Sequence, residues 1–149
     1  MKLTSLFLAA ILSLAASAAT AAEGAYAPAT KITPLIKTQV DGVGKQIVYP
    51  RGTAEVTGVH VEIPPGAQTN WHKHPFPAFA YMLEGELKVE FATGGSKTFK
   101  AGDVIAEVID LLHNGVVIGD KPVKLVMFAL GVAGQPYAVR AEQPPAGKK

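Results

Sequence analysis

The sequence contains no cysteine, so neither a disulfide framework nor a lipid-modified N-terminal cysteine is available to it. It also lacks an excess of charge of either sign. Its 14 Lys and Arg residues against 12 Asp and Glu residues give a formal net charge of +2, which is too small for electrostatic binding to nucleic acid. These absences favour a domain that is stabilised by its core and that binds a small molecule or a metal ion.

An apolar run from Leu6 to Ala16 lies near the N-terminus, preceded by Lys2 and followed by the small residues SAATAA. This pattern predicts a secretory signal peptide over residues 1–22, with cleavage between Ala18 and Ala22. A buried or membrane-spanning helix is the alternative. A span needs about 20 apolar residues, and the Ser/Thr/Ala-rich continuation disfavours one. We therefore expect a periplasmic or secreted protein that has no membrane association once the signal is removed.

After the signal, no segment sustains a helical period. Short apolar runs rich in β-branched and aromatic residues are instead separated by Gly, Pro or Asp, as in AEVTGVHVEI, AYMLEGELKVEF and VKLVMFALG. Many short strands with turn residues between them are typical of an all-β sandwich or barrel. We expect an N-terminal arm over residues 23–44, one barrel over residues 45–135 and a polar tail over residues 136–149.

Two of the four histidines stand one residue apart in the stretch WHKHPFPAFAYMLEGEL. In a strand, residues i and i+2 lie on one face, so His72 and His74 can present both imidazoles to a single point. This spacing alone is weak evidence for a metal site, because surface His-x-His pairs occur by chance. A third histidine, His113, follows another predicted strand and strengthens the interpretation. Pro75 and Pro77 remove two strand donors and predict an irregular bend after the pair.

Together these residues resemble the two motifs of the cupin family, a small double-stranded β-helix barrel that is jelly-roll-like. The first motif reads G-x5-H-x-H, then E after three or four residues, then G, and the second contains a third histidine. The matching positions are Gly66, His72, His74, Gly85, Gly102 and His113. The resemblance extends from about Lys45 to Gly131. It implies a barrel with its site on inward strand faces, and it implies a homodimer.

The departures from the motifs bear on chemistry. Ala78 stands where the family has its glutamate ligand. In the second motif Val108, Asp110 and Val117 replace the family's Pro, Gly and Asn. What the resemblance then implies is a metal site of three histidines, His72, His74 and His113. Three-histidine sites occur among cupin thiol and diketone dioxygenases, which implies Fe²⁺ as the cofactor, with Zn²⁺ or Mn²⁺ as alternatives.

A few other side chains are candidates for the site. Glu107 lies in the apolar run VIAEVID, so it either replaces the missing ligand, acts as acid or base beside the metal, or faces solvent. Tyr81 and Trp71 either line the pocket mouth and contact substrate, or pack in the core. Strand alternation places His60 toward solvent or a dimer partner rather than at the metal.

Two classes of function remain open at this point. The first is an exported metal-dependent enzyme, a dioxygenase or related oxidoreductase that acts on a small anionic organic molecule. The alternative is a non-catalytic cupin that binds a metal or a small molecule, and a zinc- or manganese-dependent isomerase or lyase is a further possibility. The cupin scaffold hosts all of these, so the resemblance does not decide between them.

Overall fold

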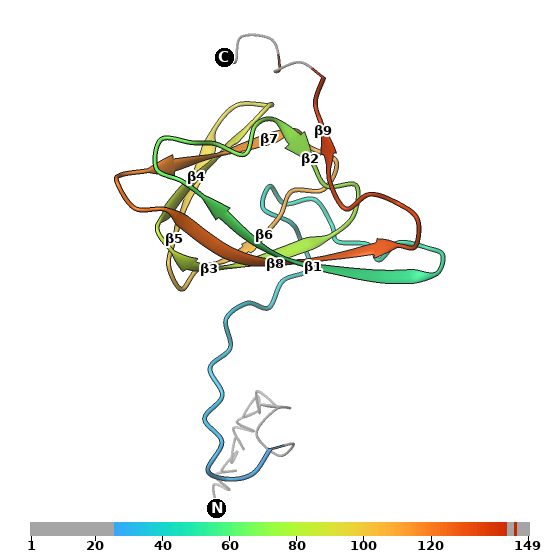
Figure 1. Ribbon diagram of the computed structural model, residues 1–149. Coiled ribbons are helices and arrows are strands. Elements are labelled where there is room, and N and C mark those ends of the chain that lie inside the picture. The colour runs from blue at the N-terminus through green and yellow to red at the C-terminus, as the bar shows by residue number, and fades with distance from the viewer. Residues whose placement is uncertain (1–25, 143–144, 146–149) are drawn as a thin grey trace, which may run out of the picture. The chain divides into compact units, whose positions relative to one another are not determined.

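The computed structural model describes residues 26–142 and residue 145 (Figure 1). That part of the chain consists of strands, turns and loops, which confirms the all-β prediction. It contains no helix that is long and apolar enough to cross a membrane. The predicted signal peptide lies outside the described residues. The nine strands are β1 Ala54–Ile63, β2 His72–Lys73, β3 Ala78–Glu84, β4 Glu86–Phe91, β5 Ser96–Lys100, β6 Val104–Ala106, β7 His113–Ile118, β8 Val123–Val132 and β9 Val139–Arg140.

The chain divides into two units, Met1–Thr33 and Pro34–Lys149, and all nine strands belong to the second unit. There they form a four-stranded sheet in the order β1-β8-β3-β6 and a five-stranded sheet in the order β5-β4-β7-β2-β9. All strand pairs within the two sheets are antiparallel. The two sheets face each other as the walls of one barrel (Figure 1).

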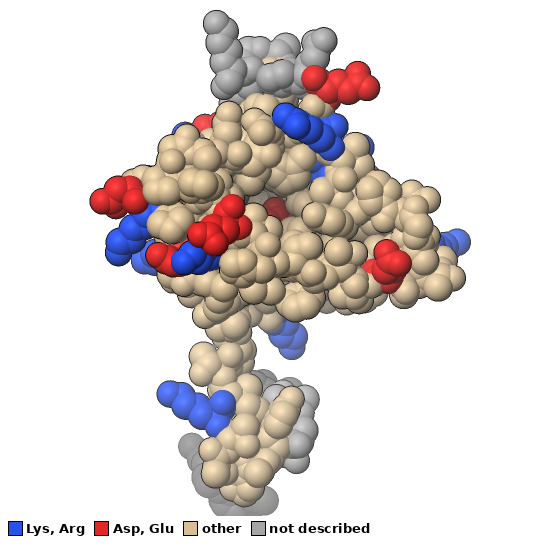
Figure 2. Space-filling model, viewed as in Figure 1, with Lys and Arg blue, Asp and Glu red and all other residues tan. Residues whose placement is uncertain are grey.

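The core lies between the sheets because the strands alternate between inward apolar and outward residues. In β8, Val123, Leu125, Met127 and Ala129 are buried, whereas the residues between them are partly or fully exposed. The outer surface is mixed. On the face shown in Figure 2, basic and acidic residues are interspersed and neither sign forms a continuous patch, in keeping with the nearly balanced composition.

The turn between β3 and β4 requires glycine. Gly85 has a φ of +79°, and a Cβ atom added there would overlap the carbonyl oxygen of Pro122. Glycine alone combines this left-handed backbone with such a close approach. Residues 75–77 lie outside the strands, as their two prolines predict, and this bend directs the chain from β2 in one sheet to β3 in the other.

The C-terminal segment differs from the predicted tail. Residues that the sequence assigns to a polar tail from position 136 include β9, which pairs with β2 through His72↔Arg140 and Lys73↔Val139. The amide of Ala141 also donates a hydrogen bond of 2.9 Å to the carbonyl of Trp71. The physical reason is that the short β2 strand has an edge whose backbone groups need partners. A two-residue strand leaves too weak a sequence pattern to predict.

Candidate metal centre

The three histidines converge on the inner face of the five-stranded sheet. His72 lies in β2 and is the direct register partner of His113, the first residue of β7. His74 follows β2 and forms a parallel bridge with Ile109, in the segment between β6 and β7. The ring centroids are 4.4 Å apart for His72 and His113, and 5.1 Å and 5.2 Å for the two pairs that include His74.

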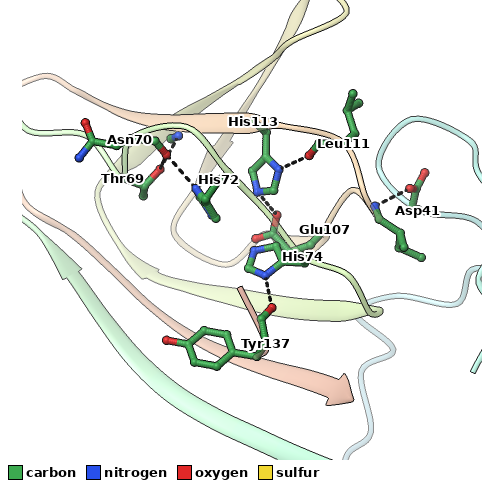
Figure 3. Close-up of polar contacts among 11 residues, drawn as sticks. Asp41, Thr69, Asn70, His72, His74, Glu107, Leu111, His113 and Tyr137 are labelled. Carbon is green, nitrogen blue, oxygen red and sulfur yellow. Dashed lines mark hydrogen bonds and ion pairs between the residues drawn. The ribbon is translucent and has the colours of Figure 1, made fainter. Parts of the chain in front are cut away.

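Each imidazole is oriented by a backbone carbonyl, as Figure 3 shows. The partners are Asn70 O at 2.8 Å from His72 Nδ1, Tyr137 O at 2.9 Å from His74 Nδ1 and Leu111 O at 2.8 Å from His113 Nδ1. A carbonyl only accepts, so each Nδ1 donates and each Nε2 keeps a free lone pair. Nδ1 bonds of this kind are the usual support for metal-ligating histidines.

The electrostatics also suit a metal ion. Burial lowers the pKa of His72, lowers that of His74 to about 4, and lowers that of His113 to about 3, where the neighbouring histidines add to the effect. All three rings are therefore neutral near pH 7, which is the state that binds a metal. One nitrogen from each ring lies within 4.8 Å of the others. The three residues fit a divalent metal ion.

The histidines border a cavity of about 350 Å³ between the two sheets, within the range of small-molecule sites. Its apolar walls are Val59, Val61, Ile63, Leu125 and Met127 from the four-stranded sheet and Leu87 and Val89 from the other sheet. Thr69, Asn70, Glu107, Tyr137 and Arg140 add polar groups. The space-filling view in Figure 2 shows a hollow on this face, with acidic atoms visible in its depth.

Glu107 lies directly after β6 and is the one carboxylate among the cavity residues. Its side chain is 11% exposed, and its Oε2 atom is 3.7 Å from His113 Nε2 (Figure 3). Burial raises the pKa of Glu107 to about 7. The structure thus brings His72, His74, His113 and Glu107 to one cavity, and of the alternatives open for Glu107 it excludes a solvent-facing position.

Other candidates lie elsewhere. Tyr81 is on the outward face of β3, 38% exposed, and does not border the cavity. Trp71 is buried at 6% exposure and packs beside β2, away from the histidine cavity. His60 is exposed on the outer face of β1, on the side that strand alternation predicts. Ala78 is 1% exposed on the inner face of β3.

Sequence reasoning misses two residues of the site. Tyr137 contributes its carbonyl to His74, and Arg140 borders the cavity mouth from β9. A carbonyl contact leaves no trace in residue type, and Arg140 belongs to the segment that the sequence predicts as a tail. The aromatic and β-branched residues of the run YAVR are the signal that could have indicated a strand there.

Comparison with known families agrees with this geometry. The profile of the family described as "Cupin domain" matches residues 59–129. This chain carries a cupin domain. The match begins in β1 and ends in β8, so the cupin region contains all three histidines and Glu107. No curated protein matches the sequence.

Solved structures share the cupin barrel. A cupin-like protein of Thermotoga maritima is 21% identical with a TM-score of 0.53, over 62% of this chain and 75% of the other. DMSP lyase DddQ of Ruegeria pomeroyi is 19% identical with a TM-score of 0.52, over 62% and 45%. Both show the fold alone.

A formate complex of oxalate decarboxylase from Lactobacillus farciminis is 26% identical with a TM-score of 0.50, over 57% of this chain and 26% of the other. The present chain therefore spans about a quarter of the decarboxylase and less than half of the lyase.

Proposed function

We propose that this protein is an exported cupin dioxygenase that binds one Fe²⁺ ion through His72, His74 and His113 and acts on a small anionic organic molecule. The observation that carries the proposal is the convergence of the three imidazoles, each fixed through Nδ1, at the border of a small cavity. A purely structural site would have no need of this adjoining space.

The donor set supports an iron centre with open positions. Imidazole nitrogen is a common ligand for iron as well as for zinc and copper. Neutral imidazole ligands leave the ion with a net positive charge, which favours an anionic substrate. When bound, iron would supply both a Lewis acid for that anion and a redox centre for O₂. In a dioxygenase both atoms of O₂ enter the organic molecule, which itself supplies the electrons, so no separate reductant is needed.

The cavity supports a small carboxylate as substrate. Arg140 is the one Lys or Arg among the cavity residues, and its guanidinium matches the geometry of a carboxylate. The largely apolar walls of the cavity leave few other polar partners for the bound molecule. The structural likeness to oxalate decarboxylase in complex with formate is consistent with an anion of this size.

The test is O₂ uptake by protein reconstituted with Fe²⁺ under anaerobic conditions and then exposed to air-saturated buffer. Diketones and small carboxylates that can take up two oxygen atoms are screened as substrates, with His113→Ala as the metal-free control. We expect O₂ uptake that needs both iron and one of these compounds.

Two results would contradict the proposal. Turnover that releases product without O₂ uptake would assign a lyase or isomerase. Tight metal and carboxylate binding with no turnover of any compound would assign a binding protein.

A further inference from the structure

The metal site lacks a carboxylate at the position where the cupin motif has one. Ala78 occupies that position, and its methyl group is buried on the inner face of β3. A methyl group cannot bind a metal. A ligand set that includes a carboxylate must therefore obtain it from another strand.

The neighbouring strand brings Glu107 next to this position. β3 and β6 are antiparallel, with Phe79 opposite Ala106, so Ala78 lies opposite Glu107. The amide of Glu107 donates a 2.9 Å hydrogen bond to the carbonyl of Ala78. The two residues are thus backbone neighbours at the same level of the barrel.

The chain after Glu107 is held in place on both sides. The amide of Ile109 donates a 2.9 Å hydrogen bond to Asp41 Oδ2, and the amide of Asp110 donates one of 2.9 Å to the carbonyl of His74. Asp41 is itself 6% exposed. Glu107 therefore lies between β6 and an anchored loop, which limits where its carboxylate can point.

The carboxylate lies on the ligand side of His113. Its Oε2 is 3.7 Å from Nε2, whereas the Nδ1 atom on the other side of the ring donates to Leu111 O (Figure 3). A residue that only supports a metal-bound histidine contacts the nitrogen that faces away from the metal. In His113 that nitrogen already donates to Leu111 O, so Glu107 instead faces the nitrogen that is free to bind a metal.

The side chains behind Glu107 are mostly apolar, and they include Val89, Phe91 and Ile105. Lys97 borders the same space, but its Nζ atom donates a hydrogen bond of 2.6 Å to the carbonyl of Gly42. Among the described residues, no Lys or Arg forms an ion pair with its carboxylate. A buried carboxylate without a cation is costly, and a metal ion at the histidines would remove this cost.

We infer that Glu107 is the fourth protein ligand of the metal and replaces, from the end of β6, the glutamate that the family pattern has at position 78. This inference rests on the proposed metal site and deepens it. Four protein ligands, one of them anionic, leave a divalent ion with a net charge of +1. A divalent ion that takes six ligands would then keep two positions for other ligands.

The first test measures the affinity of chelator-treated protein for Mn²⁺ by isothermal titration calorimetry. Glu107→Gln is compared with Glu86→Gln, whose carboxylate is exposed on β4 outside the cavity. We expect Glu107→Gln to weaken Mn²⁺ binding by about 100-fold, at or above the upper range for a supporting residue, and Glu86→Gln to bind like the wild type. Equal affinity for Mn²⁺ in Glu107→Gln and the wild type would overturn the inference.

A Co²⁺ absorption spectrum separates a ligand from a positioning residue. Loss of a ligand changes the energies and intensities of the visible bands, so the Glu107→Gln spectrum should differ from that of the wild type. A weakened site with an unchanged spectrum would show that Glu107 only positions His113, and would overturn the inference.

The third test moves the carboxylate from position 107 to position 78. The double variant Ala78→Glu/Glu107→Ala returns the carboxylate to the family position and should recover most of the Mn²⁺ affinity that Glu107→Ala alone loses. A folded double variant, verified by circular dichroism, that binds as weakly as Glu107→Ala would overturn the equivalence of the two positions. If the wild type itself binds no metal, the proposed function fails, a result distinct from each of these.

Discussion

The two sheets of the barrel have similar strands but contribute different chemistry. The inner face of the four-stranded sheet is apolar where it borders the cavity, with Val59, Val61 and Leu125 among its residues. The five-stranded sheet brings His72 and His113 to the same cavity. The difference teaches that the five-stranded sheet supplies histidines that could bind a metal ion, whereas the four-stranded sheet supplies most of the apolar wall of the cavity.

Removal of a histidine should have the largest effect. His113→Ala deletes an Nε2 donor that no neighbouring residue replaces, so metal affinity should fall by more than about 100-fold, beyond the range for loss of a supporting residue. Metal titration of chelator-treated protein measures this change. His60→Ala is the matched control, since His60 is exposed on the outer face of β1. Equal metal loss in both variants would contradict the assignment.

A change in the apolar wall should affect stability and leave metal binding intact. Leu125→Ala removes a side chain that is 5% exposed, and should lower the free energy of unfolding by about 2–3 kcal/mol, because it enlarges an existing cavity rather than a packed core. Urea denaturation measures the loss. Leu83→Ala is the control on the outer face, where Leu83 is 47% exposed, and should cost less than about 1 kcal/mol.

The opposite pattern would break the comparison between the sheets. If Leu125→Ala lowered the free energy of metal binding as much as the free energy of unfolding, the apolar wall would contribute to metal binding. The two sheets would then not have separate roles.

Glu107 is the exception to this difference between the sheets, because it is a carboxylate directly after β6 of the mostly apolar four-stranded sheet. Its effect should appear in the pH dependence of the stability of metal-free protein. Burial raises its pKa from 4.5 to about 7 in the folded state. Between these values the folded state binds more protons than the unfolded state, so this residue lowers stability as pH rises through that window. Glu107→Gln should therefore gain roughly 3 kcal/mol over the wild type between about pH 4 and about pH 8.

The buried histidines change stability with pH in the opposite direction, and they are present in both the wild type and Glu107→Gln. Their pKa values are lowered from 6.5, to about 4 for His74 and about 3 for His113, so their contribution is present above 6.5 and is lost as pH falls. Urea denaturation at several pH values in the presence of a chelator gives the difference between variant and wild type. Parallel stability curves would show that Glu107 titrates normally.

The smallest expected effect is at the cavity mouth. Arg140→Ala should weaken binding of oxalate to the metal-loaded protein by roughly fivefold. The change is modest because the side chain is exposed and its attraction is screened by solvent. Metal affinity should stay unchanged. Lys121→Ala, at an exposed position outside the cavity, is the control. An equal loss of oxalate binding in both variants would indicate only a general effect of net charge.

Much of this architecture could be predicted from the sequence, for a physical reason. Alternation of apolar and polar residues specifies strands and their inward faces, and the i, i+2 spacing of His72 and His74 predicts two imidazoles on one face. The register between two strands cannot be predicted from the residue pattern of either segment alone. The sequence therefore identifies Glu107 as a candidate but does not show that it lies opposite Ala78.

The C-terminal contribution is harder to predict for the same reason. Tyr137 acts through its carbonyl, and Arg140 reaches the cavity only because β9 pairs with β2. Tertiary hydrogen bonds, rather than local propensity, determine a two-residue strand of this kind.

The most direct test of the account is elemental analysis of the protein purified without a histidine tag, before and after anaerobic reconstitution with Fe²⁺. The account predicts close to one divalent metal ion per chain, present in the wild type and lost in His113→Ala. A wild-type protein that holds no metal in either state would contradict it, and would leave a cupin barrel that binds its ligand by shape alone.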